Sequence, residues 1–97
     1  MITRIVKMTF DPAQVPAFQD NFERHKNEIR SFEGCEKLLL LQDLNDQRVF
    51  FTYSWWQSEK HLNQYRQSEL FTEVWAFTKS LFADKPQAWS VKVKDQL

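Results

Sequence analysis

The stretch Tyr53–Phe71 reads YSWWQSEKHLNQYRQSELF and passes from a strand-like to a helix-like pattern without a glycine or a proline. Its first residues complete a run of alternating aromatic side chains that begins after Arg48 and ends at Trp56. Ser58 follows at a position suited to a helix N-cap, because a serine hydroxyl accepts hydrogen bonds from the free N–H groups of a first turn. The stretch therefore predicts a strand that ends at a bulky Trp56 and a helix that starts two residues later. Such a junction makes a good apolar wall for a pocket that binds something flat.

The helical region after Ser58 is predicted to be jointed. Leu62 and Tyr65 share one face of its first part. A second cap candidate, Ser68, begins another helical pattern downstream. The joint is therefore expected near Gln67.

A long amphipathic helix is predicted upstream of this stretch. Apolar residues recur there at steps of three and four over about five turns. They are Val15, Phe18, Phe22, Ile29 and Phe32, with His25 in the same stripe. Pro16 places the start of the helix near Gln14 or Val15, since a proline breaks the interior of a helix. Gly34, the only glycine of the chain, suits the left-handed position directly after the last turn.

Four segments have the composition and alternation of strands. They are Ile2–Phe10, Glu36–Gln42, Arg48–Trp56 and residues 89–93. Residues 43–47 predict a turn, because Asp and Asn side chains bond to their own backbone. The order strand, helix, strand, strand, helix, strand predicts an α+β fold of the ferredoxin-like, split βαβ kind. Right-handed crossovers then place both helical regions on one face of a four-stranded antiparallel sheet.

Length and composition limit the possible functions. The 97 residues are expected to form one domain, 1–97, and carry 13 Lys and Arg against 13 Asp and Glu. This balance predicts no nucleic-acid partner and no anionic membrane, since the protein would concentrate neither polyanion. The longest apolar run is Leu38–Leu41, far short of the ~20 residues that span a bilayer. A single cysteine, Cys35, and an N-terminus unlike a signal peptide favour a cytoplasmic location.

The predicted third strand carries more aromatic side chains than helices on one face can cover. Phe50 and Trp56 point to one face of the sheet, whereas Phe51, Tyr53 and Trp55 point to the other. Three exposed aromatic side chains of roughly 150–250 Å² each would match or exceed the largest apolar patch of a typical monomer, about 300–600 Å². We therefore expect a homodimer that packs through this face.

Three short motifs add a family resemblance. They are Phe32-Glu33-Gly34-Cys35, the junction Tyr53-x-x-Trp56-x-Ser58-x-x-x-Leu62, and Ser68-Glu69-Leu70-Phe71. With these motifs and the order of its elements, the chain resembles the antibiotic biosynthesis monooxygenase family of dimeric α+β barrel proteins. The resemblance implies a dimer with a pocket between helices and sheet in each subunit. It also implies oxidation of quinol-like or polyketide aromatic molecules by dioxygen, without a metal or other cofactor.

The chain departs from the family at positions that carry function in some members. Tyr65 and Leu70 stand where members often have histidines. Thr52 and Leu62 stand where the polyketide-oxidising members have Asn and Tyr. Trp75 aligns with the iron-binding His of the haem-degrading branch, so the resemblance does not favour haem degradation.

Seven residues are candidates for a site. His25 is the best-suited general base, because the ordinary pKa of histidine is ~6.5. Tyr65, placed to hydrogen-bond a substrate hydroxyl, is the second catalytic candidate. The candidates for substrate binding are Phe22, Thr52, Trp56, Leu62 and Trp75. For His25, Tyr65, Trp56 and Trp75, a packing role in the core is the alternative. No metal site is expected, because His25 and His61 lie far apart without a cluster of Cys or carboxylates.

The predicted function is cofactor-independent oxidation of an aromatic small molecule, and two other functions stay open. A dimeric domain could bind an apolar small molecule without turnover, which the missing histidines favour. The RNA recognition motif has the same order of elements, and Arg48–Tyr53 distantly resembles its third strand, which carries exposed aromatic residues for base stacking. Against RNA binding, the glycines of that motif are absent and the net charge is zero.

Overall fold

The chain folds in the order strand, helix, two strands, two helices and a last strand, and the computed structural model describes all residues from 1 to 97. The strands are β1 (Ile2–Thr9), β2 (Cys35–Gln42), β3 (Val49–Trp56) and β4 (Gln87–Val91). The helices are α1 (Val15–Arg30), α2 (Glu59–Arg66) and α3 (Glu69–Lys79), and a short 3-10 turn, η1 (Pro12–Gln14), precedes α1. None of these helices has the length and apolar composition that a membrane span needs.

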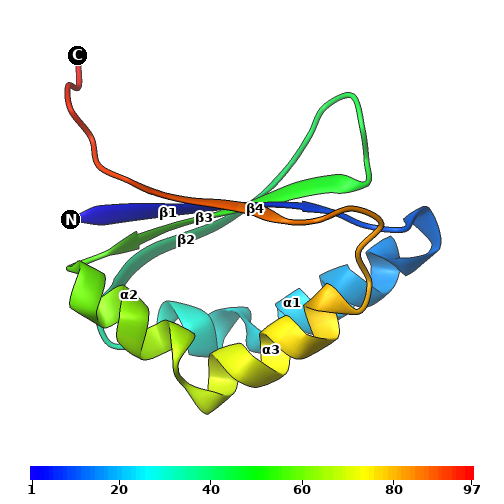
Figure 1. Cartoon of the computed structure of the whole chain (residues 1–97), viewed down its shortest axis with the longest axis horizontal. Coiled ribbons are helices and arrows are strands. Elements are labelled where there is room, and N and C mark those ends of the chain that lie inside the picture. Colours follow the sequence, from blue (N-terminus) through cyan, green and yellow to red (C-terminus); the bar gives the residue numbers. More distant parts are fainter.

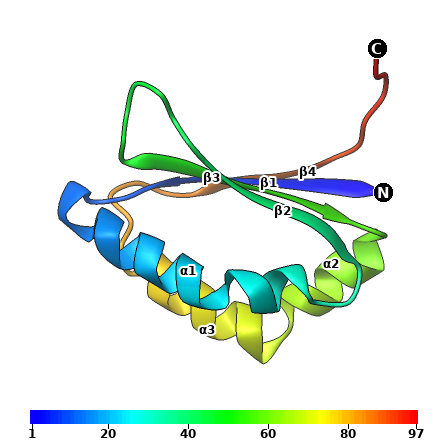
Figure 2. The same ribbon diagram turned by 180° about the vertical axis from the view of Figure 1, so that it is seen from behind.

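Neighbouring strands pair antiparallel in the order β2-β3-β1-β4. Figure 1 shows all three helices on one face of this sheet, and the view from behind in Figure 2 shows the same arrangement. The predicted ferredoxin-like α+β fold is therefore confirmed. Its consequence is a sheet with two different faces, one packed on helices and one free of them.

Two serines start the helices that follow β3, as predicted. Ser58 Oγ accepts a hydrogen bond from the backbone N–H of His61 at 3.2 Å. Ser68 Oγ accepts one from the backbone N–H of Phe71 at 3.1 Å. Gln67 is the C-cap of α2 between them, so the predicted joint is confirmed.

The predicted end of the first helix is wrong, although its start near Val15 is confirmed. The helix ends at Arg30, and the backbone N–H of Ser31 closes its last turn on the Asn27 carbonyl at 3.0 Å. Phe32 turns out of the helix and packs its ring edge-on against Tyr65, with centroids 5.4 Å apart. Gly34 thus lies beyond the helix end, but it has the predicted left-handed conformation, with φ of +89°.

The last strand also ends earlier than predicted. Val91 pairs with Thr3 and is the final residue of β4, so Val93 lies outside the sheet. In the same register Val93 would lie opposite Met1, which is outside β1, so Val93 has no strand residue to pair with.

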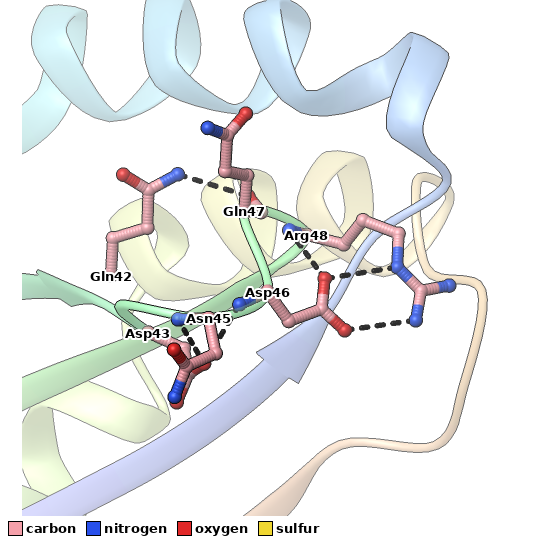
Figure 3. Close-up of polar contacts among 6 residues, drawn as sticks. All are labelled: Gln42, Asp43, Asn45, Asp46, Gln47 and Arg48. Carbon is pink, nitrogen blue, oxygen red and sulfur yellow. Dashed lines mark hydrogen bonds and ion pairs between the residues drawn. The ribbon is translucent and has the colours of Figure 1, made fainter.

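Side chains of the turn between β2 and β3 hold it in shape, as predicted (Figure 3). Asp43 accepts hydrogen bonds from the backbone N–H groups of Asn45 and Asp46 at 2.9 and 2.8 Å. Asp46 in turn accepts two from the Arg48 guanidinium, at 3.1 and 3.0 Å. These bonds from Arg48 hold the pKa of the Asp46 carboxyl below its usual range. Asp43, Asp46 and Arg48 therefore make their hydrogen bonds to groups of the same turn.

Two apolar clusters pack between the sheet and the helices. The larger contains Met8, Phe10, Phe18, Phe50 and Leu81, and the smaller contains Cys35, Trp56 and Leu62. Because Met8 pairs with Phe50 and Ile2 pairs with Trp56, the clusters lie at opposite ends of the β1–β3 pair.

The helix-free face carries a row of apolar side chains across all four strands. Leu39, Tyr53, Ile5 and Trp89 lie opposite one another in register. Leu39 is 40% exposed and Trp89 is 44% exposed, which is high for side chains of this size. Phe51, Tyr53 and Trp55 lie on this face, as the alternation of β3 predicts.

Replacing Gly34 with alanine should lower the free energy of unfolding by roughly 2 kcal/mol or more. The left-handed conformation costs a residue with a Cβ about 1–2 kcal/mol, and the added methyl group would collide with the side chain of His61. Urea unfolding followed by tryptophan fluorescence measures the change. The control is Glu33→Ala at the exposed neighbouring position, which should shift stability by less than about 0.5 kcal/mol. Equal midpoints for the two variants would contradict this account of Gly34.

Candidate functional site

A cavity of about 310 Å³ lies between the sheet and the helices. Met8 and Phe18 of the larger apolar cluster line one part of it, and Trp56 and Leu62 of the smaller cluster line another. Of its 19 lining residues, 13 are hydrophobic. The volume is at the small end of the range for ligand pockets, so the cavity suits one compact, mostly apolar molecule.

The pleat of the strands decides which side chains face the cavity. Arg4 and Val6 of β1 line it, as do Thr52, Ser54 and Trp56 of β3, because side chains two residues apart share a face of a strand. The Ser54 hydroxyl accepts a hydrogen bond from Trp56 Nε1 at 2.9 Å. Ser54 therefore orients the indole of Trp56, while the Thr52 hydroxyl lies in the lining without a side-chain partner.

Stacked aromatic rings form the wall beside α2 and α3. The rings of Trp56 and Tyr65 stack with centroids 4.9 Å apart and an angle of 24° between planes. Tyr65 meets Phe71 edge-on at 5.2 Å, and Phe71 stacks on Trp75 at 5.9 Å. We call these four residues the aromatic wall. A flat ligand can lie against it with the offset or edge-on geometry that aromatic pairs prefer.

Tyr65 brings a hydroxyl group to this wall. Burial raises the pKa of its phenol above the ordinary range, and the neighbouring Cys35 thiol adds to the rise. The hydroxyl therefore stays protonated at neutral pH, where it is a hydrogen-bond donor and not a base. The backbone carbonyl of Tyr65 accepts a hydrogen bond from Ser68 Oγ. The phenol hydroxyl is not used in that bond and can serve a ligand.

Six of the seven residues that the sequence suggests for a site line this cavity. They are Phe22, Thr52, Trp56, Leu62, Tyr65 and Trp75. The seventh, His25, does not line it, and its Nδ1–H donates to the backbone carbonyl of Asn21 at 2.8 Å. The structure thus brings the six together, while their roles in binding and catalysis stay predictions.

The second histidine, His61, is held within its own element, as His25 is. The ring Nδ1 of His61 is 2.7 Å from Ser58 Oγ and so belongs to the cap of α2. No group of three or more His, Cys, Asp or Glu side chains comes together in the chain.

Sequence reasoning missed two charged residues of the lining, Arg4 and Arg66. A signal for Arg4 was present, because residues two apart share a face of a strand, and Arg4 therefore points with Val6 toward the helices. A signal also existed for Arg66, which follows Leu62 by four residues and so shares its face of α2. It reaches the cavity because α2 packs on β3 through Leu62, which is a long-range contact.

Comparisons with known proteins agree with this architecture. A conserved protein of Methanosarcina mazei has the same fold, with a TM-score of 0.90 and 21% identity over 97% of this chain and 94% of that chain. A solved antibiotic biosynthesis monooxygenase gives a TM-score of 0.92 at 15% identity, over 98% of this chain and all 100% of its own. A candidate antibiotic biosynthesis monooxygenase of Nitrosomonas europaea gives 0.90 at 14% identity, over 98% and 100%. No protein of curated function matches the sequence.

Structural likeness at such identities shows the fold alone, but the sequence itself also matches a family. The match is to the family described as antibiotic biosynthesis monooxygenase, over residues 1–76 of the 97. It includes the turn after α1, the junction from β3 to α2 and the joint between α2 and α3. The chain therefore belongs to the antibiotic biosynthesis monooxygenase family.

Proposed function

We propose that the chain binds a flat aromatic molecule in this cavity and oxidises it with dioxygen, without a metal or organic cofactor. The observation that carries the proposal is the aromatic wall along one side of a mostly apolar cavity, in a chain of this family. A ring held there would be shielded from water and fixed in orientation. Both effects favour a reaction in which the substrate itself supplies the electrons.

The chemistry asks for few protein groups. An electron-rich phenol or enol that has lost a proton can pass an electron to dioxygen directly. In the oxidation of an anthrone, one oxygen atom replaces the two hydrogens of the methylene carbon as a carbonyl, and the other leaves as water. Tyr65 would donate a hydrogen bond to the substrate oxygen on which negative charge develops, and the apolar lining would exclude water.

Non-catalytic binding is the second candidate function, and one observation favours it. The cavity lining contains no His, Asp, Glu, Lys or Cys side chain. It therefore offers no group that titrates near neutral pH and could take a proton from a bound substrate. Under this alternative the same aromatic wall holds the ligand, and no turnover follows.

Metal-stripped protein should accelerate oxygen uptake by an anthrone or hydroquinone above the rate in buffer, measured with an oxygen electrode. Tyr65→Phe should lower this rate by about tenfold or more, because it removes one donor to the developing oxyanion. The matched control is Tyr53→Phe, which removes the hydroxyl on the helix-free face and should leave the rate unchanged. If the protein accelerates oxygen uptake by neither anthrones nor hydroquinones, the catalytic proposal is excluded and non-catalytic binding is left as the candidate function.

The role of His25 as general base is a prediction that the same assay tests. If His25 takes the proton, His25→Ala should lose most of the rate while circular dichroism shows an intact fold. An unchanged rate would exclude it as the base, in accord with its position outside the cavity lining.

We also propose that two copies of the chain pack through their helix-free faces. The apolar row across the four strands supports this, since its members include side chains that are 40–44% exposed in the single chain. Phe51, Tyr53 and Trp55 add aromatic surface to the same face. Burial of such a face between two copies would remove it from water.

For the compartment we propose the cytoplasm, because the single Cys35 is buried and unpaired.

Sedimentation of the protein at micromolar concentration should give about twice the chain mass, and Leu39→Glu should shift it toward the monomer. A carboxylate buried in an apolar interface is costly to desolvate. The control is Leu44→Glu, because Leu44 is 98% exposed in the loop after β2 and belongs to no sheet face. A monomeric parent protein, or a dimer that Leu39→Glu leaves intact, would contradict the proposed interface.

A further inference from the structure

Two arginines line an otherwise uncharged cavity. Arg4 comes from the middle of β1 and Arg66 from the last turn of α2. None of the 19 lining residues is Asp or Glu. The ion pairs of the chain are Glu23–Lys26 and Asp46–Arg48, so neither cavity arginine has a carboxylate partner.

Arg4 is only partly satisfied by the protein. Its side chain makes one hydrogen bond, from Nη1 to Ser90 Oγ at 3.0 Å, although a guanidinium has five N–H donors. The residue is half-buried, and burial lowers the pKa of its guanidinium, with the nearby charge of Arg66 acting in the same direction. Arg4 nevertheless stays charged at neutral pH, since the ordinary pKa of a guanidinium lies far above neutral.

Arg4 is half-buried and Arg66 is exposed, and their like charges repel each other, so an anion bound between them would offset the repulsion. No such anion is supplied by the chain, as its lining and its ion pairs show. Guanidinium groups bind carboxylates and other oxyanions with paired, charge-assisted hydrogen bonds. The arginines therefore have the chemistry of an anion subsite next to the aromatic wall.

We propose that the ligand of this cavity is an aromatic oxyanion, whose ring lies along the aromatic wall and whose anionic group is held by Arg4 and Arg66. This inference rests on the cavity of the proposed function and names the class of molecule that it accepts. The oxyanion is either a carboxylate or a ring hydroxyl that the two cations ionise. In both cases the arginines fix which end of the molecule enters the cavity, and a neutral analogue leaves their charges unpaired.

A ring hydroxyl ionised by the arginines would also explain how the reaction proceeds without a general base in the cavity lining. Positive charge within reach of a phenol or enol stabilises its ionised form and so lowers its pKa. Arg4 and Arg66 would then ionise the substrate without a titratable side chain in the lining, and the proton would pass to solvent. Electron transfer to dioxygen starts from this ionised form.

Calorimetric titration with three matched probes tests the proposal. They are 2-naphthoate, a permanent anion; 2-naphthamide, its neutral analogue; and 2-naphthol, which ionises. The parent protein should bind 2-naphthoate at least about tenfold tighter than 2-naphthamide, as expected for charge-assisted hydrogen bonds. If a ring hydroxyl is the source, bound 2-naphthol shows the absorption of its anion at neutral pH.

Arg4→Gln and Arg66→Gln separate this role from packing. Each should weaken 2-naphthoate by about tenfold or more and change 2-naphthamide by less than about twofold, with the melting temperature checked for each. The control is Arg24→Gln, since Arg24 is exposed on α1 and does not line the cavity. It should change neither affinity.

The outcomes distinguish this inference from the proposed function. Equal affinity for 2-naphthoate and 2-naphthamide, with 2-naphthol bound as the neutral molecule, would overturn the anion subsite and leave an aromatic-binding cavity. Unchanged 2-naphthoate binding in both arginine variants would overturn it as well. Binding of none of the three probes would reject the cavity as an aromatic site, and the inference with it. Selective anion binding without oxygen uptake would keep the subsite and reject the oxidation.

Discussion

The packing around Trp56 holds three separate segments of this protein together at one end of the cavity. Its indole is 1% exposed, donates to Ser54 on the same strand and stacks on Tyr65 of α2. Phe32, from the turn after α1, meets it edge-on at 6.4 Å. One side chain thus connects β3, α2 and the turn between α1 and β2. It fixes one end of the cavity and gives the aromatic wall its first ring.

Alternation along β3 divides the protein into two surfaces with different roles. Thr52, Ser54 and Trp56 face the helices and line the cavity, while Tyr53 and Trp55 face away from them. The helices cover one face only (Figure 1), so the second face keeps exposed apolar side chains. The two apolar clusters lie at opposite ends of the β1–β3 pair, and members of both line the cavity between the sheet and the helices.

Local patterns in the sequence predicted the order of elements, the caps at Ser58 and Ser68, and the joint between the last two helices. They were less reliable at ends that depend on distant partners. The first helix ends before Phe32, whose ring packs on Tyr65, and Val93 lies outside β4, since its place in the register is opposite Met1, before the start of β1. In the site, six of the seven candidate residues face one cavity, because strand alternation and helix periodicity already assign them to inward faces.

The sequence by itself determined the fold class, the family, the two faces of β3 and the aromatic character of the pocket. The family follows from the sequence match, and the others follow from spacing along the chain, where backbone geometry sets the direction of every side chain. Only the tertiary structure decided that His25 lies outside the cavity and that Arg4 and Arg66 line it together. Periodicity assigns each arginine to an inward face, but their approach to one cavity depends on how α2 packs over the sheet, which spacing along the chain does not give.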